Sequence, residues 1–199
     1  DLWRQIMANG FHQLGDAASG TTPADIFAFL KVCGRFAVPL PMAELLLGHS
    51  WGVAQLAPCE GLVSIGRQHG KQAIQVPWGR RAQRVFGVEE NSQVVCVADA
   101  PVCVQEGSNM AAEARDTIEL GPDTQQITLS DDPFAQMALA RTNLMAGTLQ
   151  STLDLGLQFA AEREQFGRSI SKFQAIQHSL AVVAAEVAAA QRAADAGVD

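Results

Sequence analysis

The segment AEREQFGRSISKFQAIQH, residues 161–178, joins two long stretches with helical periodicity and decides the fold of the C-terminal third. Before this segment, Asp132 can cap a helix that starts at Pro133. Apolar and small residues then continue to about Ala161 without an internal proline. Gly167 is expected to stop this helix. The pattern therefore predicts one long helix that ends inside the quoted segment.

A second helix is expected to follow at once. Residues 171–174, Ser-Lys-Phe-Gln, have the spacing of a capping box. The positions expected to form the buried face recur at helical spacing and are Phe173, Ile176, Leu180, Val183 and Val187. Two long amphipathic helices cannot bury their apolar faces alone. We therefore expect further chain in the parent protein, or another subunit, to cover them.

The middle of the chain, from about Gly61 to Leu129, has a different period. Residues 71–76 alternate between polar and apolar side chains, as a half-buried strand does. Further strand-like runs, separated by turn residues, are 93–98, 102–104, 117–120 and 125–129. Several short strands at this spacing predict a small antiparallel sheet or barrel.

The first 58 residues are expected to be helical. Thr22-Pro23-Ala24-Asp25 has the residues of a helix start, and an apolar helix is expected to begin at Met42. The order of helices, strands and long helices predicts an α+β fold. It would comprise a helical N-terminal domain (1–58), a small antiparallel β middle domain (59–130) and the long antiparallel helices of an incomplete C-terminal helical bundle (131–199).

Composition limits the function classes. The 199 residues are 48% hydrophobic and 18% charged, which is enough apolar content for a packed core and argues against a disordered chain. The net charge of -7 argues against a nucleic-acid partner. No apolar run is long enough to span a membrane, and no signal peptide is visible at the start, so a cytoplasmic protein is expected.

The four cysteines do not have the spacing of a zinc site, and no metal ligands are predicted. Cys33, Cys59, Cys96 and Cys103 are expected to be buried, reduced thiols. Arg80, Arg81 and Arg84 form a small basic cluster. The cluster could meet the phosphates of a coenzyme, or it could simply be the solvated end of a strand.

The quoted segment resembles the acyl-CoA dehydrogenase family. That family carries R-x-Q-F-G-x-P-I followed by F-Q-x-I-Q-H between two long helices of its C-terminal domain, and residues 163–170 and 173–178 match this pattern. The order of the three zones is also similar to that family. Residues 76–82 and 109–116 look like the reduced middle domain of its shorter members.

The resemblance implies a flavin site shared between subunits. The matching residues of the family touch FAD that is bound mainly by a neighbouring subunit. The residues implied to bind the cofactor here are Arg163, Gln165, Phe166, Ile170, Phe173 and Gln174. Arginine suits a pyrophosphate, and the aromatic faces suit planar rings. Simpler interpretations exist: a helix-end cation for Arg163, core anchors for Phe166 and Phe173, and a capping residue for Gln174.

Several family features are missing from the sequence. Ser169 replaces the usual proline of the motif, and the flavin-holding T-E-P-x-x-G-S-D and W-x-T-N segments are absent. The family's catalytic glutamate is also absent: one of its positions would lie beyond Asp199, and the other falls near Met137 and Ala138. Asp131 and Asp132 lie nearby, but Asp132 is expected to be a cap. No catalytic residue is assigned.

The resemblance implies a subunit of an FAD-dependent acyl-CoA dehydrogenase. Such an enzyme removes a proton α to an acyl-CoA thioester and passes hydride to the flavin. The implied partners are an acyl-CoA substrate, a homo- or hetero-oligomer formed through the C-terminal helices, and electron-transfer flavoprotein as the electron acceptor. The alternative is a non-catalytic assembly subunit that binds no cofactor. The identity of the acyl group is left open.

Overall fold

A computed structural model of the chain describes residues 2–14, 20–52 and 55–198. Its residues group into two compact units: residues 1–26 with 39–138, and residues 27–38 with 139–199. The chain passes between the units three times: inside helix α2 (Pro23–Arg35), between Val38 and Pro39, and inside helix α4 (Pro133–Glu162). The predicted division into three domains is based on the order of helices and strands along the chain, whereas the two units group residues that contact each other in space. The three-domain division stays a prediction.

The first unit contains a seven-stranded sheet with the strand order β5-β6-β2-β1-β3-β4-β7. The strands are β1 (Val63–His69), β2 (Gln72–Pro77), β3 (Arg84–Val88), β4 (Val94–Asp99), β5 (Val102–Gln105), β6 (Arg115–Glu119) and β7 (Gln125–Thr128). All neighbours are antiparallel except β1 and β3, which pair in parallel. The α+β fold with a mostly antiparallel sheet is thus confirmed.

The parallel pair has a simple cause in the chain path. After β2 the chain turns through the short 3-10 helix η3 (Gly79–Arg81) and crosses to the other side of β1. It therefore enters β3 in the direction of β1. All five residues of β3 are buried, and a strand that is covered on both faces shows no alternation. For this reason β3 could not be recognised by a period of two.

The N-terminal helices are α1 (Leu2–Ala8), the 3-10 helix η1 (Phe11–Gln13), α2 and α3 (Met42–Gly52). The predicted start of α2 is confirmed. There the backbone N–H of Thr22 donates to Asp25 Oδ2 at 2.7 Å. Helix α3 is apolar around most of its circumference and packs against β1, with Gly48 next to Val63 and Phe86.

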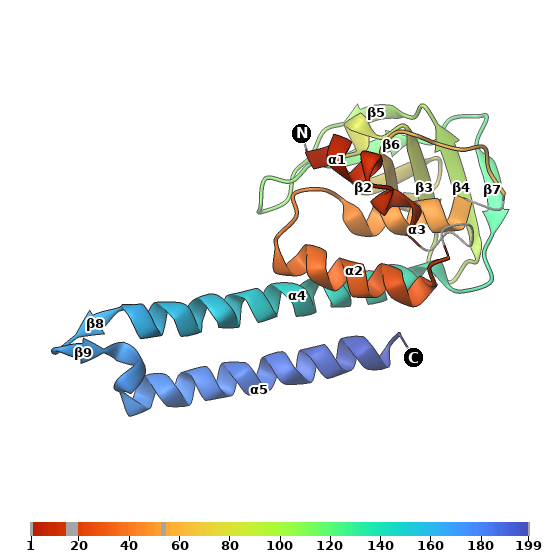
Figure 1. Cartoon of the computed structure of the whole chain (residues 1–199). Helices are drawn as coiled ribbons and strands as arrows, with labels where there is room; N and C mark the ends of the chain where they lie inside the picture. The colour runs from red at the N-terminus through yellow and green to blue at the C-terminus, as the bar shows by residue number, and fades with distance from the viewer. Residues whose placement is uncertain (1, 15–19, 53–54, 199) are drawn as a thin grey trace. The chain divides into compact units, whose positions relative to one another are not determined.

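The second unit is dominated by α4 and α5 (Gln174–Ala196), which run antiparallel and side by side (Figure 1). They are connected by a short β-hairpin and a 3-10 helix. The hairpin consists of β8 (Glu164–Gln165) and β9 (Arg168–Ser169), and the 3-10 helix is η4 (Ile170–Lys172). Gln191 Nε2 on α5 donates to the carbonyl of Ala146 on α4 at 2.9 Å. The two predicted long helices are therefore confirmed.

Two local predictions in this unit are wrong. The predicted end of α4 near Ala161 is confirmed, since the helix ends at Glu162, but Gly167 does not stop it, because Gly167 lies in the turn of a β-hairpin. The capping box is also wrong: Phe173 is the N-cap residue of α5 and makes no side-chain cap. Ser169 instead caps η4, since its hydroxyl accepts from the backbone N–H of Ser171 at 3.3 Å. Because the 3-10 helix η4 lies between the hairpin and α5, the capping serine is Ser169, before η4, and not Ser171.

All four cysteines are free, as predicted for reduced thiols, but only Cys33 is buried. Cys59 lies in a loop, Cys96 on β4 and Cys103 on β5, and all three are half-buried. Burial raises the pKa of the Cys33 thiol to about 11, so it stays protonated. Within the described part of the chain, no helix is long and apolar enough to cross a membrane.

Candidate functional site

Five of the six residues implied to bind a cofactor meet in one pocket of the second unit. Arg163, Gln165, Phe166, Ile170 and Phe173 line a cavity of about 580 Å³ at the junction of α4 and α5. Phe159, Ala175 and Ile176 complete its wall. Gln174 is exposed at the first turn of α5 and is not among the lining residues. Its role in binding stays a prediction.

The hairpin gives this pocket a defined shape. Phe166 and Gly167 have φ values of 52° and 77°, so both turn residues adopt the left-handed conformation that fits a two-residue hairpin. This conformation projects the Phe166 side chain outward, and Phe166 is 90% exposed. Its ring packs edge to face against Phe173, with 6.1 Å between centroids. The pocket therefore offers two perpendicular aromatic faces.

Arg163, which directly precedes the hairpin, and Arg168, which lies in it, differ in their surroundings. The guanidinium of Arg168 lies 4.4 Å from the centre of the Phe173 ring, in a cation–π contact. The Arg163 side chain is exposed and lines the pocket, and no described residue pairs with its charge. The backbone N–H of Arg163 donates to the carbonyl of Phe159 at 2.9 Å, and this bond holds the Arg163 backbone against the last turn of α4. Arg163 is thus the cation available to a ligand in this pocket.

The predicted basic cluster of the first unit is a set of internal contacts. Arg80 pairs with the buried carboxylate of Asp116, with 2.6 Å from Nη2 to Oδ1, and also with Glu106. Arg84 makes two hydrogen bonds to Asp99. Neither guanidinium is a free phosphate ligand. Ion pairs therefore take the place of the phosphate contact for Arg80 and Arg84. Arg80 and Arg81 are exposed, as the solvated alternative predicted, whereas Arg84 is buried.

The acids nearest the missing catalytic base serve the start of α4. Asp132 Oδ1 accepts from the backbone N–H of Phe134 at 2.8 Å, which confirms its predicted capping role. Asp131 accepts from the Ser130 hydroxyl at 3.1 Å. Neither acid lines either of the two described pockets. A catalytic residue stays unassigned.

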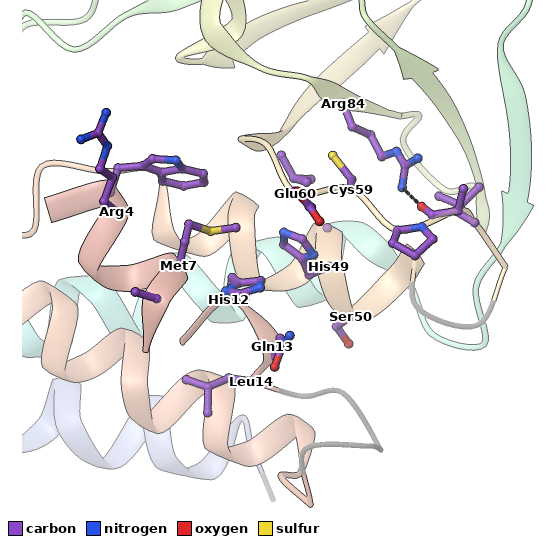
Figure 2. A pocket seen from close by; sticks show the side chains of 18 residues that line it. Arg4, Met7, His12, Gln13, Leu14, His49, Ser50, Cys59, Glu60 and Arg84 are labelled. Carbon is purple, nitrogen blue, oxygen red and sulfur yellow. Dashed lines mark hydrogen bonds between the residues drawn. The ribbon is translucent and has the colours of Figure 1, made fainter. Parts of the chain in front are cut away.

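A second cavity, of about 740 Å³, lies in the first unit (Figure 2). It is lined by α1, η1, the end of α3, the segment 56–60 and the starts of β1 and β3. His12 and His49 meet there, with ring centroids 5.3 Å apart and planes at 65°. The two histidines are 37 positions apart in sequence (49 − 12) and follow no motif, so sequence reasoning missed the pair. Only the packing of η1 onto α3 brings them together.

The histidine pair is neutral near pH 7. Burial lowers the pKa of His49 to about 4, with smaller contributions from the charges of His12 and Arg84. Burial also lowers the pKa of His12, against a hydrogen bond with the backbone of Ile6 that raises it. The cavity therefore presents imidazole nitrogens without a net positive charge.

We expect this burial to make the first unit acid-sensitive. Unfolded His49 takes up a proton near pH 6.5, whereas folded His49 does so only near pH 4. The contribution of neutral His49 to the free energy of unfolding is fully present above about pH 6.5. It is lost as the pH falls from there to about 4, because the unfolded chain binds a proton that the folded chain does not. The free energy of unfolding, measured with urea, should fall by about 2–3 kcal/mol more in the wild type than in His49→Phe over this pH interval. Replacing the exposed His69 by phenylalanine is the control, and parallel wild-type and His49→Phe profiles would contradict the expectation.

Comparison with known proteins gives the family context. Residues 129–198 match the model of the acyl-CoA dehydrogenase C-terminal domain. Acyl-CoA dehydrogenase IpdE2 of Mycolicibacterium smegmatis is 27% identical over 96% of this chain and 63% of its own length. Probable acyl-CoA dehydrogenase YngJ of Bacillus subtilis is 52% identical over 22% of this chain and 12% of its own length. The chain thus spans less than two thirds of the curated relatives it matches.

Solved structures share the fold. The Tcur3481-Tcur3483 steroid ACAD G363A variant superposes with a TM-score of 0.78, at 18% identity, over 99% of this chain and 67% of that one. The ChsE4-ChsE5 complex from Mycobacterium tuberculosis has a TM-score of 0.66, at 18% identity, over 99% of this chain and 70% of that one. Both comparisons cover both units of the chain.

Proposed function

We propose that this chain, which belongs to the acyl-CoA dehydrogenase family, is one subunit or one part of a flavin-dependent enzyme that desaturates an acyl-CoA thioester between its α and β carbons. In this proposal the chain supplies one wall of a flavin site, and a partner chain supplies the rest. The observation that carries the proposal is the pocket of Arg163, Gln165, Phe166, Ile170 and Phe173 at the junction of α4 and α5.

The residues of this pocket fit a dinucleotide. The exposed Arg163 guanidinium has no described partner and suits a pyrophosphate, which accepts bidentate hydrogen bonds. The Gln165 amide can donate to or accept from a ribose or ring edge. Phe166 and Phe173 provide aromatic surface, and Ile170 provides apolar contact. When bound, FAD would supply the acceptor for the hydride that leaves the thioester.

The family features that this sequence lacks support a shared site. The sequence has neither of the two family segments that hold the flavin ring and no glutamate at the family position within its length. The pocket is open, and its most prominent aromatic ring, Phe166, is exposed to 90%. These features support a role in completing a partner's site. The two solved complexes, whose names each pair two proteins, support a hetero-oligomer, and the steroid enzyme among them favours a bulky acyl group.

An assembly role without a cofactor is the second candidate. It is favoured by the exposed apolar side chains of α4 and α5, which are Met145, Leu149, Leu155, Leu157, Phe159, Val182 and Val183. Such residues need a covering partner whether or not a flavin is bound. A purely structural subunit would have no use for Arg163, and this difference separates the two candidates.

Substitution of Arg163 tests the proposal. In the complex assembled with its co-expressed partner, Arg163→Ala should weaken flavin binding about 10- to 100-fold, because a charged hydrogen-bond donor to phosphate is lost. The change is exposed and should leave the free energy of unfolding within about 0.5 kcal/mol of the wild type. Flavin content is read from the absorbance near 450 nm after dialysis at low flavin concentration.

Lys172→Ala is the matched control, because this exposed cation lies on η4 but does not line the pocket. It should retain the flavin of the wild type. Equal flavin content in Arg163→Ala and wild type would remove Arg163 from the site. A fully assembled wild-type complex that contains no flavin would favour the assembly role instead.

A further inference from the structure

The cavity of the first unit is separate from the proposed flavin wall and has the features of a ligand site. We propose that it binds an uncharged molecule with an apolar, ring-sized body and a hydroxyl group that hydrogen-bonds to the pair formed by His12 and His49. The inference does not depend on the proposed function, because every residue that lines this cavity lies in the first unit.

The first argument is that two buried ring nitrogens lack partners. No described residue hydrogen-bonds to His12 Nδ1 or to His49 Nε2, although both atoms are buried. Leaving buried polar atoms unpaired costs free energy, so native proteins almost always provide a partner. Both histidines line the cavity. A ligand there is in place to supply the missing partner.

The second argument concerns which kind of group can be that partner. A neutral imidazole carries a proton on one ring nitrogen and a lone pair on the other, so each unpaired nitrogen is either a donor or an acceptor. A hydroxyl group can both donate and accept hydrogen bonds. It can therefore be the partner of His12 Nδ1 or of His49 Nε2, whether that nitrogen donates or accepts.

The third argument is that neither arginine lining the cavity offers a free positive charge to the pair. Arg4 is exposed and makes its own contact within the protein, and Figure 2 shows its guanidinium directed away from the histidines. The guanidinium of Arg84 makes two hydrogen bonds to Asp99 and a third, of 2.9 Å from Nη1, to the carbonyl of Ala57. The carboxylate of Glu60 also lines the cavity and would repel an anion. A carboxylate or phosphate ligand is thus disfavoured, and a neutral one is favoured.

The side chains that line the cavity indicate that the ligand has an apolar ring system. Trp3, Met7, Leu14, Leu56 and Val63 present aromatic, thioether and aliphatic surface to the cavity. Its volume of about 740 Å³ is within the range of small-molecule sites and holds a fused-ring body. The described residues contain no group of three or more His, Cys, Asp or Glu side chains that could hold a metal ion.

Three naphthalene probes test the proposal on the whole chain. 2-Naphthol carries the hydroxyl, naphthalene lacks it, and 2-naphthoate replaces it with a charge. We expect 2-naphthol to bind with a Kd on the order of 0.1–1 mM, as expected for a ligand of this size. Its binding should shift the ¹⁵N resonances of both imidazole rings at pH 7.5. Naphthalene and 2-naphthoate should each bind at least about fivefold more weakly.

Three variants make the test specific. His49→Phe and His12→Phe keep a ring in place but remove the nitrogens, so each should reduce the affinity for 2-naphthol to that for naphthalene. His69→Phe is the control, because His69 is exposed on β1 outside the cavity. Equal binding of naphthol and naphthalene, tighter binding of naphthoate, or no binding of any probe would overturn the proposal. Far-UV circular dichroism shows whether each variant is folded, and the probe comparison on the wild type needs no variant.

Discussion

Replacing Gly147 by alanine is expected to destabilise the second unit by about 3 kcal/mol or more. A Cβ atom at this position would lie 1.9 Å from the carbonyl oxygen of Lys31 and 2.8 Å from the backbone nitrogen of Arg35. Both atoms belong to the backbone of α2, which cannot rotate away as a side chain can. The two helices must separate, and separation opens gaps in a packed interface. Urea unfolding followed by circular dichroism measures the loss.

Gly156→Ala, on the same helix, is the matched control with the opposite expected sign. Its Cβ would lie 3.7 Å from Leu180 Cδ2, an ordinary contact. Alanine favours a helix over glycine by up to about 1 kcal/mol, so this variant should be neutral or more stable than the wild type. Equal stability of Gly147→Ala and Gly156→Ala would contradict the proposed close approach of α2 and α4.

The reason for this approach is visible on the other helix. Gly34 on α2 faces α4 in the same way, since its Cβ would lie 2.0 Å from the carbonyl oxygen of Leu144. The Thr148 hydroxyl donates to the Gly34 carbonyl at 3.1 Å, a contact that only a close crossing permits. Two glycines that are 113 positions apart in sequence (147 − 34), one on each helix, therefore permit the same close crossing of α2 and α4. No pattern in either helix alone indicates this pairing.

The parts of the fold that were predictable are set by neighbours in sequence. The starts of α2 and α4 follow from Thr22-Pro23 and Asp132-Pro133, where the cap and the first helical residue are adjacent. The long helices follow from their period and from the absence of internal proline. Likewise, five residues of the motif in 163–173 reach one pocket because a short hairpin keeps them together.

The features that escaped prediction depend on distant partners or on backbone conformation. The parallel pairing of β1 with β3 and the meeting of His12 with His49 are set by the chain path. The hairpin at 164–169 requires a left-handed Phe166, a conformation that is uncommon for an aromatic residue and gives no sequence signal. The partner of Arg80 was likewise unpredictable, since Asp116 lies 36 positions away.

Asp116→Asn is expected to cost about 3–5 kcal/mol, because it breaks a network around a fully buried carboxylate. Asp116 accepts from the backbone N–H groups of Arg80 at 2.8 Å and Gly107 at 3.1 Å, and from the Arg80 guanidinium. Burial acts to raise the pKa of Asp116, but these donors outweigh it and lower the pKa. Asparagine has nearly the same shape, yet its NH₂ group would face hydrogen-bond donors where the carboxylate offers an acceptor.

The exposed second partner of Arg80 provides the control for this prediction. Glu106 is 70% exposed, and Glu106→Gln should cost less than about 1 kcal/mol, as for surface ion pairs. Asp116 binds the backbone of η3, the crossover that places β3 parallel to β1, so its loss should also increase amide hydrogen exchange at residues 79–88. If the two variants were equally stable, with unchanged exchange in this segment, the arginine network would be an ordinary surface feature and the crossover would be held by packing of β3 alone.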